Sequence, residues 1–496
     1  MFEKIRSDSI SSVVFQVLGY ATTFIIGIYI VKKLSVNAFG AFSLFNVFIM
    51  IAPAVITFNV QDYFLVNISP AKKPEENFRL FSTIGLFVIM ATIVIGGLIA
   101  IPPISKPLLA FFDLSAYPNS FYFVLGYLLL YGICLNYLRF FRFTQAIRTY
   151  NILYFLIIAA WMIPVLIMGV SVDNIFLSRL LIVLATATAA MIIFKIYHGH
   201  IGYGFAFDKK LLKDALIFGA GTYIGTMSGL LMDVTDKLML SAMVGNKSVG
   251  LYNFATMPFM AIVSFMNGTV FLIAVPYINE MHHRNDIAKY DLYFQLMQKI
   301  VLYLSPILVF LVVFARDIII ILGKTEYLQI SGAFGILAVS YLILILVRLP
   351  KQELYLTRRL KILNGIALTS LALNFLMDLF LIKYFDYMGA IYASLVARLF
   401  MIVMLLGLAR IWRSGLAKIG WTWRWIILLI MTGLGARLAQ EFCSLPDNLA
   451  LRIVILIGLF AVFFFVYTVG LFLFGLMSDR EKNFLRKVLK LGHGTL

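Results

Sequence analysis

Apolar runs about as long as a lipid bilayer is thick recur along the whole chain. A membrane-spanning helix needs roughly twenty such residues, and we place spans near 10–31, 40–61, 79–101, 119–140, 150–170, 174–196, 214–243, 249–275, 299–322, 329–349, 362–384, 388–410, 424–441 and 450–476. Of the 496 residues, 62% are hydrophobic and 13% are charged, which leaves too little polar surface for a soluble protein. The sequence therefore predicts an all-α integral membrane protein with about fourteen transmembrane helices.

Lysine and arginine gather in alternate connections between these runs. The net charge of +18 is spread over short basic segments, and opposite connections such as 171–174 and 324–327 are short and nearly neutral. Cytoplasmic loops of membrane proteins carry an excess of Lys and Arg, so both termini are predicted to be cytoplasmic. Basic residues that are scattered in this way argue against nucleic acid as a partner, and membrane lipids are the expected surroundings.

A weak internal repeat links the two halves of the chain. Sliding the sequence by 210 residues sets 32–46 against 242–256, so that Gly40 falls on Gly250 and Phe42 on Tyr252. Each segment follows the first helix of a six-helix unit, which predicts a parallel repeat around an axis along the membrane normal. We therefore expect three parts: a six-helix bundle over 1–200, a second over 201–412, and a further helix pair with a basic cytoplasmic tail over 413–496.

Several motifs resemble the polysaccharide transporter branch of the multidrug/oligosaccharidyl-lipid/polysaccharide exporter superfamily. They are LSxxxFGxF (34–42), the intramembrane Asp236 followed by VGxYxxA (249–255), YMGAIYASLVAR (387–398) and RFFRFTQAIRTYN (139–151). The resemblance implies two six-helix bundles around a central cavity in the bacterial inner membrane, with O-antigen flippases of the Wzx type as the expected relatives. It also implies that a polyprenyl-diphosphate-linked oligosaccharide, an O-antigen or other surface polysaccharide unit of lipopolysaccharide biosynthesis, is the substrate. A polysaccharide polymerase in the same membrane is a further expected partner.

Cations inside the spans are the predicted contacts for a diphosphate. Arg398 lies near the middle of the twelfth span, Arg179 just inside the outer end of the sixth, and Arg139 and Arg142 share a face at the cytoplasmic end of the fourth. Arginine binds phosphate oxygens through several donors at once. For Arg139 and Arg142 the alternative is a topological anchor bound to lipid phosphates. Lys237 is a further cavity candidate, although an ion pair with Asp233 four residues earlier is the favoured interpretation.

Three acidic residues in the spans are the candidates for coupling or gating. Asp233 pairs with Lys237 in this interpretation, which leaves Asp236 without a local partner. Asp236 would then bind a proton or a sodium ion, or a basic residue of the other half. Asp378 is a second isolated acid, with Arg398 as a possible partner on the next helix.

The remaining function classes fit the sequence less well. A proton- or cation-coupled drug antiporter of the same superfamily would need more acid than base in the cavity. An integral glycan polymerase or ligase would need catalytic side chains on outer loops, which here are short. The sequence contains no metal-ligand spacing, no phosphate-cradling glycine loop and no nucleophile–base arrangement, so we expect no enzyme activity, no cofactor and no metal. The prediction is a flippase that works by alternating access.

Overall fold

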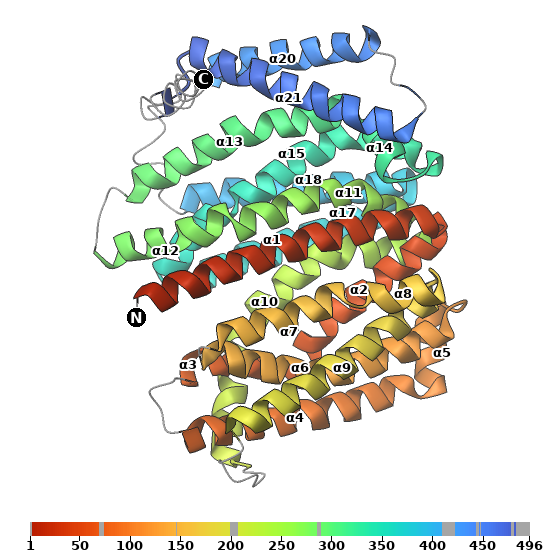
Figure 1. Ribbon diagram of the computed structural model, residues 1–496, viewed down its shortest axis with the longest axis vertical. Coiled ribbons are helices and arrows are strands. Elements are labelled where there is room, and N and C mark those ends of the chain that lie inside the picture. Colours follow the sequence, from red (N-terminus) through yellow and green to blue (C-terminus); the bar gives the residue numbers. More distant parts are fainter. Residues whose placement is uncertain are drawn as a thin grey trace, which may run out of the picture. The chain divides into compact units, whose positions relative to one another are not determined.

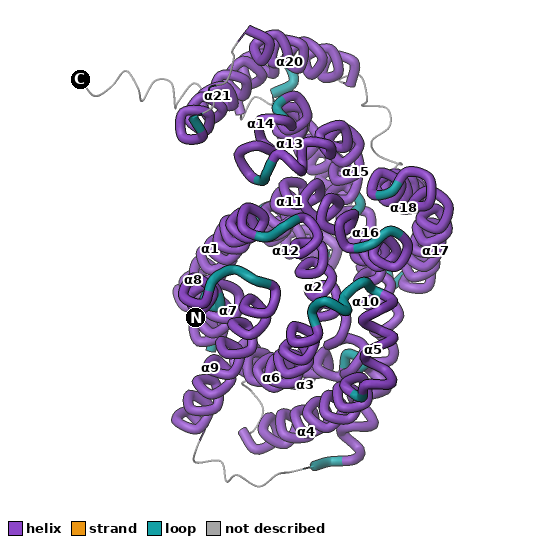
Figure 2. The backbone as a smooth tube through the Cα atoms, turned by 90° about the vertical axis from the view of Figure 1, so that its right-hand side faces the viewer, coloured by secondary structure: helices purple, strands orange, loops and turns teal. Residues whose placement is uncertain are grey.

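The structure is a computed structural model that describes residues 2–68, 74–144, 146–198, 207–284, 289–408, 422–442, 446, 448–477 and 481–482. The predicted boundaries at 200/201 and 412/413 lie outside these residues, as does the tail from 483 onward. Figure 1 shows the chain as helices coloured along the sequence. Figure 2 shows that short loops join the helices and that the described part contains no strand.

The elements of the first predicted bundle are α1 (Phe2–Lys33), α2 (Val36–Thr57), the 3-10 helix η1 (Val60–Tyr63), α3 (Phe64–Asn67), α4 (Pro74–Ala100), α5 (Pro102–Phe111), α6 (Pro118–Phe143), α7 (Ile147–Ala159), α8 (Met162–Met168) and α9 (Val172–His198). The following elements are α10 (Lys209–Met243), α11 (Asn246–Gly268), α12 (Val270–His283), α13 (Lys289–Val313), α14 (Ala315–Leu322), the 3-10 helix η2 (Thr325–Ala333), α15 (Phe334–Leu346), α16 (Arg348–Leu356), α17 (Leu360–Phe385), α18 (Tyr387–Leu408), α20 (Thr422–Phe442) and α21 (Leu449–Leu473).

Each of the fourteen predicted spans coincides with one or more of these helices, so the all-α prediction is confirmed. Within the described residues, 11 helices are long and apolar enough to cross a membrane. The number rises to 12 if α10, which bends by 47° between Tyr223 and Gly225, is taken as one span. The chain is a multi-pass membrane protein.

Local sequence signals explain where several helices begin. Ser35 caps α2 by accepting a hydrogen bond from the Ala38 amide, and Asp208 caps α10 by accepting from Lys210 and Leu211. Both use a short polar side chain to satisfy amides that have no partner in the first helical turn. Pro102 and Pro118 open α5 and α6, where a missing N–H costs nothing.

One predicted span is broken in a way that matters for the site. The apolar run 150–170 forms α7 and α8, which are separated at Ala160 and Trp161. Pro164 has no N–H to donate to the carbonyl of residue 160, so the regular hydrogen-bond pattern of the helix is interrupted at this point. The indole Nε1 of Trp161 donates to the Ile158 carbonyl at 2.7 Å and fixes the ring at the break.

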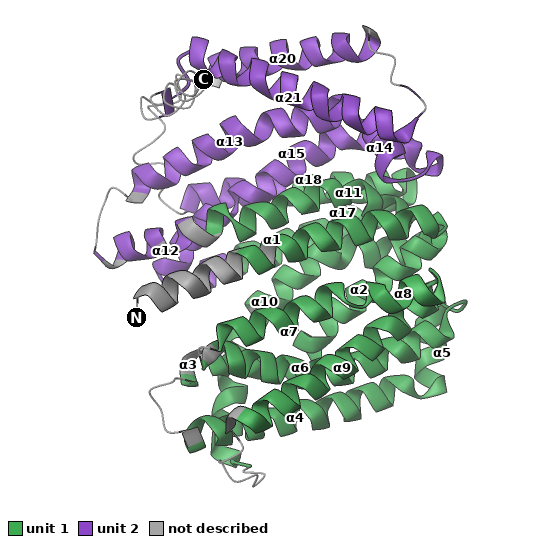
Figure 3. Cartoon of the chain, in the orientation of Figure 1, with its two compact units in different colours: residues 1–272, 364–397 green, residues 273–363, 398–496 purple. Residues whose placement is uncertain are grey.

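The chain divides into two compact units, which Figure 3 colours separately. Unit 1 comprises 1–272 and 364–397, and unit 2 comprises 273–363 and 398–496. Unit 1 therefore contains the first predicted bundle together with α10, α11, most of α17 and the first part of α18. Each unit is described here by itself.

In unit 1, α2 packs along α11 at the two glycines that the repeat aligns. A Cβ atom at Gly40 would lie 1.7 Å from the carbonyl oxygen of Asn246, and one at Gly250 would lie 2.2 Å from that of Val36. Val36 and Asn246 are themselves 210 residues apart, so the contact is reciprocal. Such a self-complementary contact is what a two-fold axis produces. Only glycine permits this approach of two backbones.

The connection after α5 is tied to the turn between α10 and α11, also in unit 1. Asp113 Oδ2 accepts a hydrogen bond from the Asn246 amide at 3.3 Å, and the Asp113 carbonyl accepts one from Asn246 Nδ2. Ser241 Oγ donates to the Phe112 carbonyl at 2.8 Å. Asn246 and Ser241 are buried, so these bonds satisfy groups that would otherwise be costly to bury.

In unit 2, polar contacts fasten the C-terminal helix pair to α13. Tyr467 of α21 donates its hydroxyl to the Leu302 carbonyl at 2.8 Å, and Trp425 of α20 donates to Ser305 Oγ at 3.1 Å. Lys299 pairs with Glu481 at 2.5 Å. These polar contacts lie beside the apolar cluster that contains Leu302 and Leu428 and hold its helices together.

Candidate functional site

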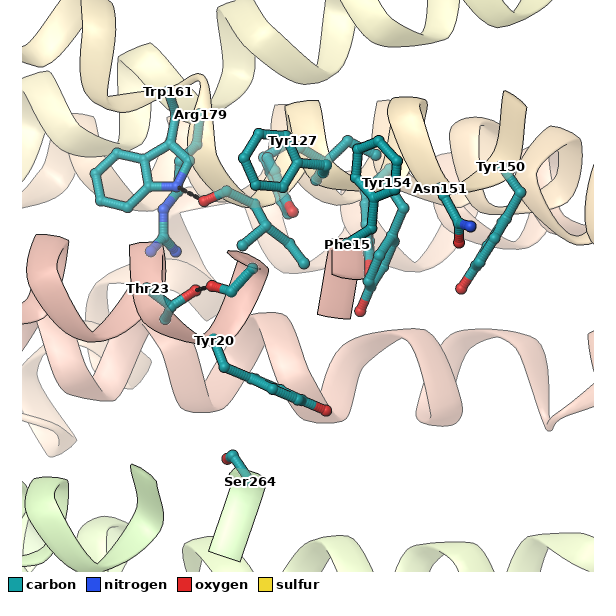
Figure 4. A pocket seen from close by; sticks show the side chains of 15 residues that line it. Phe15, Tyr20, Thr23, Tyr127, Tyr150, Asn151, Tyr154, Trp161, Arg179 and Ser264 are labelled. Carbon is teal, nitrogen blue, oxygen red and sulfur yellow. Dashed lines mark hydrogen bonds between the residues drawn. The ribbon is translucent and has the colours of Figure 1, made fainter. Parts of the chain in front are cut away.

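A cavity of about 410 Å³ lies inside unit 1, between α1, α6, α7, α9 and α11. Its polar wall is mostly tyrosine, so we call it the tyrosine cavity; its residues are Phe15, Gly19, Tyr20, Thr23, Tyr127, Tyr131, Tyr150, Asn151, Tyr154, Phe155, Ile157, Ile158, Trp161, Arg179 and Ser264. Figure 4 shows Trp161 and Arg179 at one end and Tyr150 at the other, with Tyr127 and Tyr154 between them. The volume falls in the range typical of small-molecule sites.

Two pairs of tyrosines form flat surfaces in this wall. Tyr127 and Tyr131 of α6 stack with ring centroids 5.2 Å apart, and Tyr150 and Tyr154 of α7 stack at 5.6 Å. Each pair is spaced four residues apart and so projects from one helical face. A tyrosine ring combines an apolar face with a hydroxyl that forms hydrogen bonds, which suits a ligand that has both C–H faces and hydroxyl groups.

Arg179 of α9 stands at one end of the tyrosine cavity among three aromatic rings. Its guanidinium carbon lies 4.6 Å from the centroid of the Trp161 ring, 5.3 Å from that of Phe42 and 5.4 Å from that of Phe176. Nη1 donates to Oδ1 of Asn46 on α2, and Nε is buried without a hydrogen-bond partner among the described residues. The rings favour the cation through cation–π attraction, yet no acidic side chain in the described part of the chain forms an ion pair with it.

The tyrosine cavity is therefore positively charged. Arg179 is the single charged side chain among the 15 residues that line it, and none of them is Asp or Glu. A buried cation without an acidic partner is costly, and an anionic ligand that entered the cavity would offset that cost. The break between α7 and α8 places Trp161 in its position beside Arg179.

Arg139 and Arg142, the predicted first contacts for a diphosphate, differ in their surroundings. Arg139 Nη1 lies 2.9 Å from Oδ1 of Asp62 in η1, and both side chains are about one-third exposed. Asp62 is thus the ion-pair partner of Arg139. Arg142 is exposed, with its guanidinium 5.5 Å from the ring centroid of Tyr150 in the cavity wall.

Four helices of unit 1 bring buried polar groups together around Asp236; we call Asp236, Tyr252, Asn374, Asp378 and Ser394 the acidic cluster. Ser394 Oγ donates to Asp236 Oδ2 at 2.6 Å, Asn374 Nδ2 donates to Oδ1 at 3.1 Å, and the Tyr252 hydroxyl also donates to Oδ2. These donors come from α11, α17 and α18, so the partners of Asp236 lie on other helices, and its role in coupling stays a prediction. All three donors are neutral, so none of them cancels the charge; Lys237, which donates to Asn253, is a cation that interacts electrostatically with Asp236.

Asp378 is the second carboxyl group of the acidic cluster. It is fully buried and close enough to Asp236 for the two carboxyl groups to interact electrostatically. Neither Asp378 oxygen, nor Oδ1 of Asn374, has a hydrogen-bond donor in the described part of the chain. Two adjacent carboxylates cannot both remain charged in a buried site unless a proton or a cation lies between them.

The oxygens of the acidic cluster match the ligands of a hard monovalent cation. Carboxylate, amide and hydroxyl oxygens are the ligand types that hard cations prefer, and all five side chains of the cluster carry one. Among the described residues, no three or more His, Cys, Asp or Glu side chains are grouped so that they could hold a metal ion. Such groups are typical of transition-metal sites. The cluster is thus suited to a sodium ion or a proton.

The structure places the remaining predicted residues as follows. Lys237 Nζ donates to Oδ1 of Asn253 at 2.6 Å, and Asp233 lies on an exposed face of α10; their proposed ion pair stays a prediction. In unit 2, Arg398 is 7% exposed, donates to Ser340 Oγ at 2.8 Å and lies 4.5 Å from the ring centroid of Tyr341. Arg398 thus repeats the combination of a neutral acceptor and an aromatic ring that surrounds Arg179.

Sequence reasoning missed the aromatic residues of the tyrosine cavity and the role of Asn46. The four-residue spacing of Tyr127 with Tyr131, and of Tyr150 with Tyr154, is a usable signal because tyrosine hydroxyls are rarely placed in pairs toward lipid. No local pattern connects Asn46 to Arg179.

Comparisons with known proteins agree with this architecture. Residues 5–282 match the sequence profile of a family described as polysaccharide biosynthesis protein. A curated relative, an uncharacterized membrane protein of Methanocaldococcus jannaschii, is 24% identical over 291 residues, which cover 57% of this chain. The match spans only 55% of that relative's length.

Two solved structures share the fold. The lipid II flippase MurJ in an inward closed conformation aligns with a TM-score of 0.66 and 14% identity, over 93% of this chain and 97% of MurJ. A variant of the Vibrio cholerae MATE transporter VcmN aligns with a TM-score of 0.51 and 11% identity, over 82% of this chain and 97% of VcmN. These identities establish the fold alone. Because the profile covers more than half of the chain, the protein belongs to the polysaccharide biosynthesis protein family, within the multidrug/oligosaccharidyl-lipid/polysaccharide exporter superfamily.

Proposed function

We propose that this protein is a flippase that moves a polyprenyl-diphosphate-linked oligosaccharide, an O-antigen or other surface polysaccharide unit, across the bacterial inner membrane. The main support is the tyrosine cavity, where one unneutralised cation, Arg179, stands beside stacked tyrosine rings. The substrate needs both chemistries, because its diphosphate requires donors and positive charge and its sugars require hydroxyl partners and flat apolar faces.

Substrate enters from the cytoplasmic side in this proposal, with both termini on that side. Arg142 stands at the Tyr150 end of the tyrosine cavity and makes the first contact with the diphosphate. The headgroup then passes along the tyrosines toward Arg179, while the prenyl chain stays in lipid. Exposure to the other side follows when the two repeats rock against each other, as in alternating access.

The acidic cluster is the proposed site of the coupling ion. A sodium ion or a proton that binds between Asp236 and Asp378 relieves their repulsion and favours the conformation in which the two carboxyl groups lie together. Release of the ion in the other conformation would then drive the return. The cluster lies on α10, α11, α17 and α18, helices that do not line the polar part of the tyrosine cavity, apart from Ser264 of α11.

A direct test uses the purified full-length protein in phospholipid vesicles. A fluorescent short-chain polyprenyl diphosphate that carries one sugar is placed in both leaflets, and a membrane-impermeant quencher reports the fraction that crosses. We expect transbilayer movement to accelerate with the protein, and a sodium or proton gradient to increase the rate. Unchanged movement under every gradient would contradict the proposal.

The alternative is a cation-coupled drug antiporter, which the acidic cluster and the shared fold with VcmN keep in consideration. The positive tyrosine cavity argues against cationic drugs as its ligands. Uptake of a fluorescent organic cation into the same vesicles separates the two functions. A glycan polymerase or ligase is the third possibility, and it would elongate the glycan in these vesicles when given lipid-linked units.

A further inference from the structure

Asn46 is the one hydrogen-bond partner of Arg179 among the described residues, and its own orientation is fixed. Its amide Nδ2 donates to the Phe42 carbonyl one turn earlier on α2 at 2.8 Å, which turns Oδ1 toward the Arg179 guanidinium. An asparagine that points its oxygen at a cation has used its donor elsewhere. The assignment of oxygen and nitrogen therefore follows from both bonds together.

The acceptor at this position carries no charge, which has a consequence for the cavity. An aspartate here would have nearly the same shape and would bind Arg179 more strongly, because its negative charge would add Coulomb attraction to the hydrogen bond. It would also cancel the positive charge. Arg139 illustrates that arrangement, since Asp62 neutralises it at 2.9 Å.

The rings around Arg179 support the same conclusion. Trp161, Phe42 and Phe176 enclose the guanidinium without offering it a carboxylate, and Nε remains without a partner. Asn46 and these rings thus hold the guanidinium in place, while its uncancelled charge and the terminal N–H groups that Asn46 does not use remain for a ligand. A bidentate contact with a phosphate group would occupy such donors.

The geometry points to Asn46 as a positioning residue that holds Arg179 at the end of the tyrosine cavity as an anion-binding cation and so makes the site selective for phosphorylated lipid-linked sugars. This inference rests on the proposed function for the identity of the transported lipid. It concerns the anion site itself, which inorganic pyrophosphate can probe without any transport.

The test compares three side chains of similar size at position 46. Asn46→Asp keeps the acceptor but neutralises Arg179, and Asn46→Leu removes the acceptor but leaves the charge. We expect the affinity for pyrophosphate and for the diphosphate lipid to fall about 10- to 100-fold in Asn46→Asp and about 3- to 10-fold in Asn46→Leu, in line with the value of a charged hydrogen bond. Affinity for a polyprenyl glycoside that lacks phosphate should not change.

Controls separate positioning from folding. Asn67→Asp makes the same substitution at an asparagine that also donates to the carbonyl four residues earlier, and it should leave binding unchanged. In an Arg179→Ala background, Asn46→Asp should cause no further loss, because residues that act through one group are not additive.

Different outcomes test the positioning role of Asn46 and the proposed flippase function. Equal loss of phosphorylated and unphosphorylated ligands in Asn46→Asp, or a full additional loss in the Arg179→Ala background, would overturn the positioning role. So would a wild-type protein that does not bind pyrophosphate. Wild-type binding of pyrophosphate that responds to Asn46 as expected, without any movement of the diphosphate lipid, would support the anion site and overturn the flippase proposal instead.

Discussion

In the tyrosine cavity a single cation is held by neutral side chains beside a cavity. In the acidic cluster two carboxyl groups lie buried in the same unit, and neutral side chains hold one of them. Asn46 supports Arg179, and Ser394, Asn374 and Tyr252 support Asp236. Arg179 and Asp236 thus both have neutral side chains as hydrogen-bond partners. The difference in sign indicates different partners, an anionic substrate in one and a small cation in the other.

Holding a charged side chain with neutral partners costs free energy that a direct ion pair would avoid. Two like charges 4 Å apart repel by on the order of 4 kcal/mol at the effective dielectric of a protein surface. Arg139 with Asp62, and Lys299 with Glu481, show that this chain forms direct ion pairs elsewhere. The two sites therefore store free energy that binding of the correct ligand releases, which is the requirement for a coupled transporter.

Removal of the cation from the tyrosine cavity should have the largest effect. Arg179→Ala should lower the transbilayer movement of the diphosphate lipid about 100-fold, because a charged contact to the phosphates is lost. Arg179→Lys should recover only part of the rate, since an ammonium cannot form the bidentate contact. The vesicle quenching assay measures both. Arg437→Ala, at an exposed arginine paired with Glu441, is the control and should not change the rate.

Removal of one carboxyl group from the acidic cluster should have the next largest effect, with a different signature. Asp378→Asn should abolish the stimulation of transport by the ion gradient, so that the rate under a gradient falls about tenfold or more. Binding of the diphosphate lipid should stay intact. It should also raise the thermal unfolding midpoint of the ion-free protein in detergent, because the repulsion with Asp236 disappears. A lower midpoint with gradient stimulation intact would show that the two carboxyl groups do not act as an ion site.

The stacked tyrosines should matter less than either charge. Tyr154→Ala removes one ring of the Tyr150 pair and should raise the apparent KM for the sugar-bearing lipid about 3- to 10-fold, in line with the 0.5–1.5 kcal/mol of an aromatic contact. Tyr154→Phe should keep the stacking and lose only the hydroxyl. An equal effect on a diphosphate lipid without sugar would show that the tyrosines do not contact the glycan.

A neutral donor of the acidic cluster should give the smallest measurable change. Ser394→Ala removes one hydrogen bond to Asp236 and should change the ion concentration for half-maximal stimulation by about threefold. Ser370→Ala is the matched control, because Ser370 is equally buried on the face of α17 that carries Asn374 and Asp378, yet its hydroxyl has no partner among the described residues. Similar shifts in both variants would contradict the specific role of Ser394.

The sequence predicted the spans and the charges inside them, but not how those charges combine. Length and hydropathy locate helices such as α6 and α9 because the bilayer demands a fixed apolar length. Arg179 and Asp378 stand out for the same reason, since charge in a span is rare. The partner of each comes from another helix far along the chain, so Asn46 and Asp236 carry no local signal. The break at Trp161 was predictable in principle from Pro164. The contact of the Trp161 ring with the Arg179 guanidinium was not, because it depends on tertiary packing.

The reciprocal contact of Gly40 and Gly250 bears on the history of the chain. A half-length ancestor with one such glycine would have formed the same contact twice in a symmetric homodimer, since each backbone would have met its own copy. If two copies of such a gene fused, the halves could then diverge, one toward a cation beside a cavity and the other toward paired acids, while both kept the glycine at the axis.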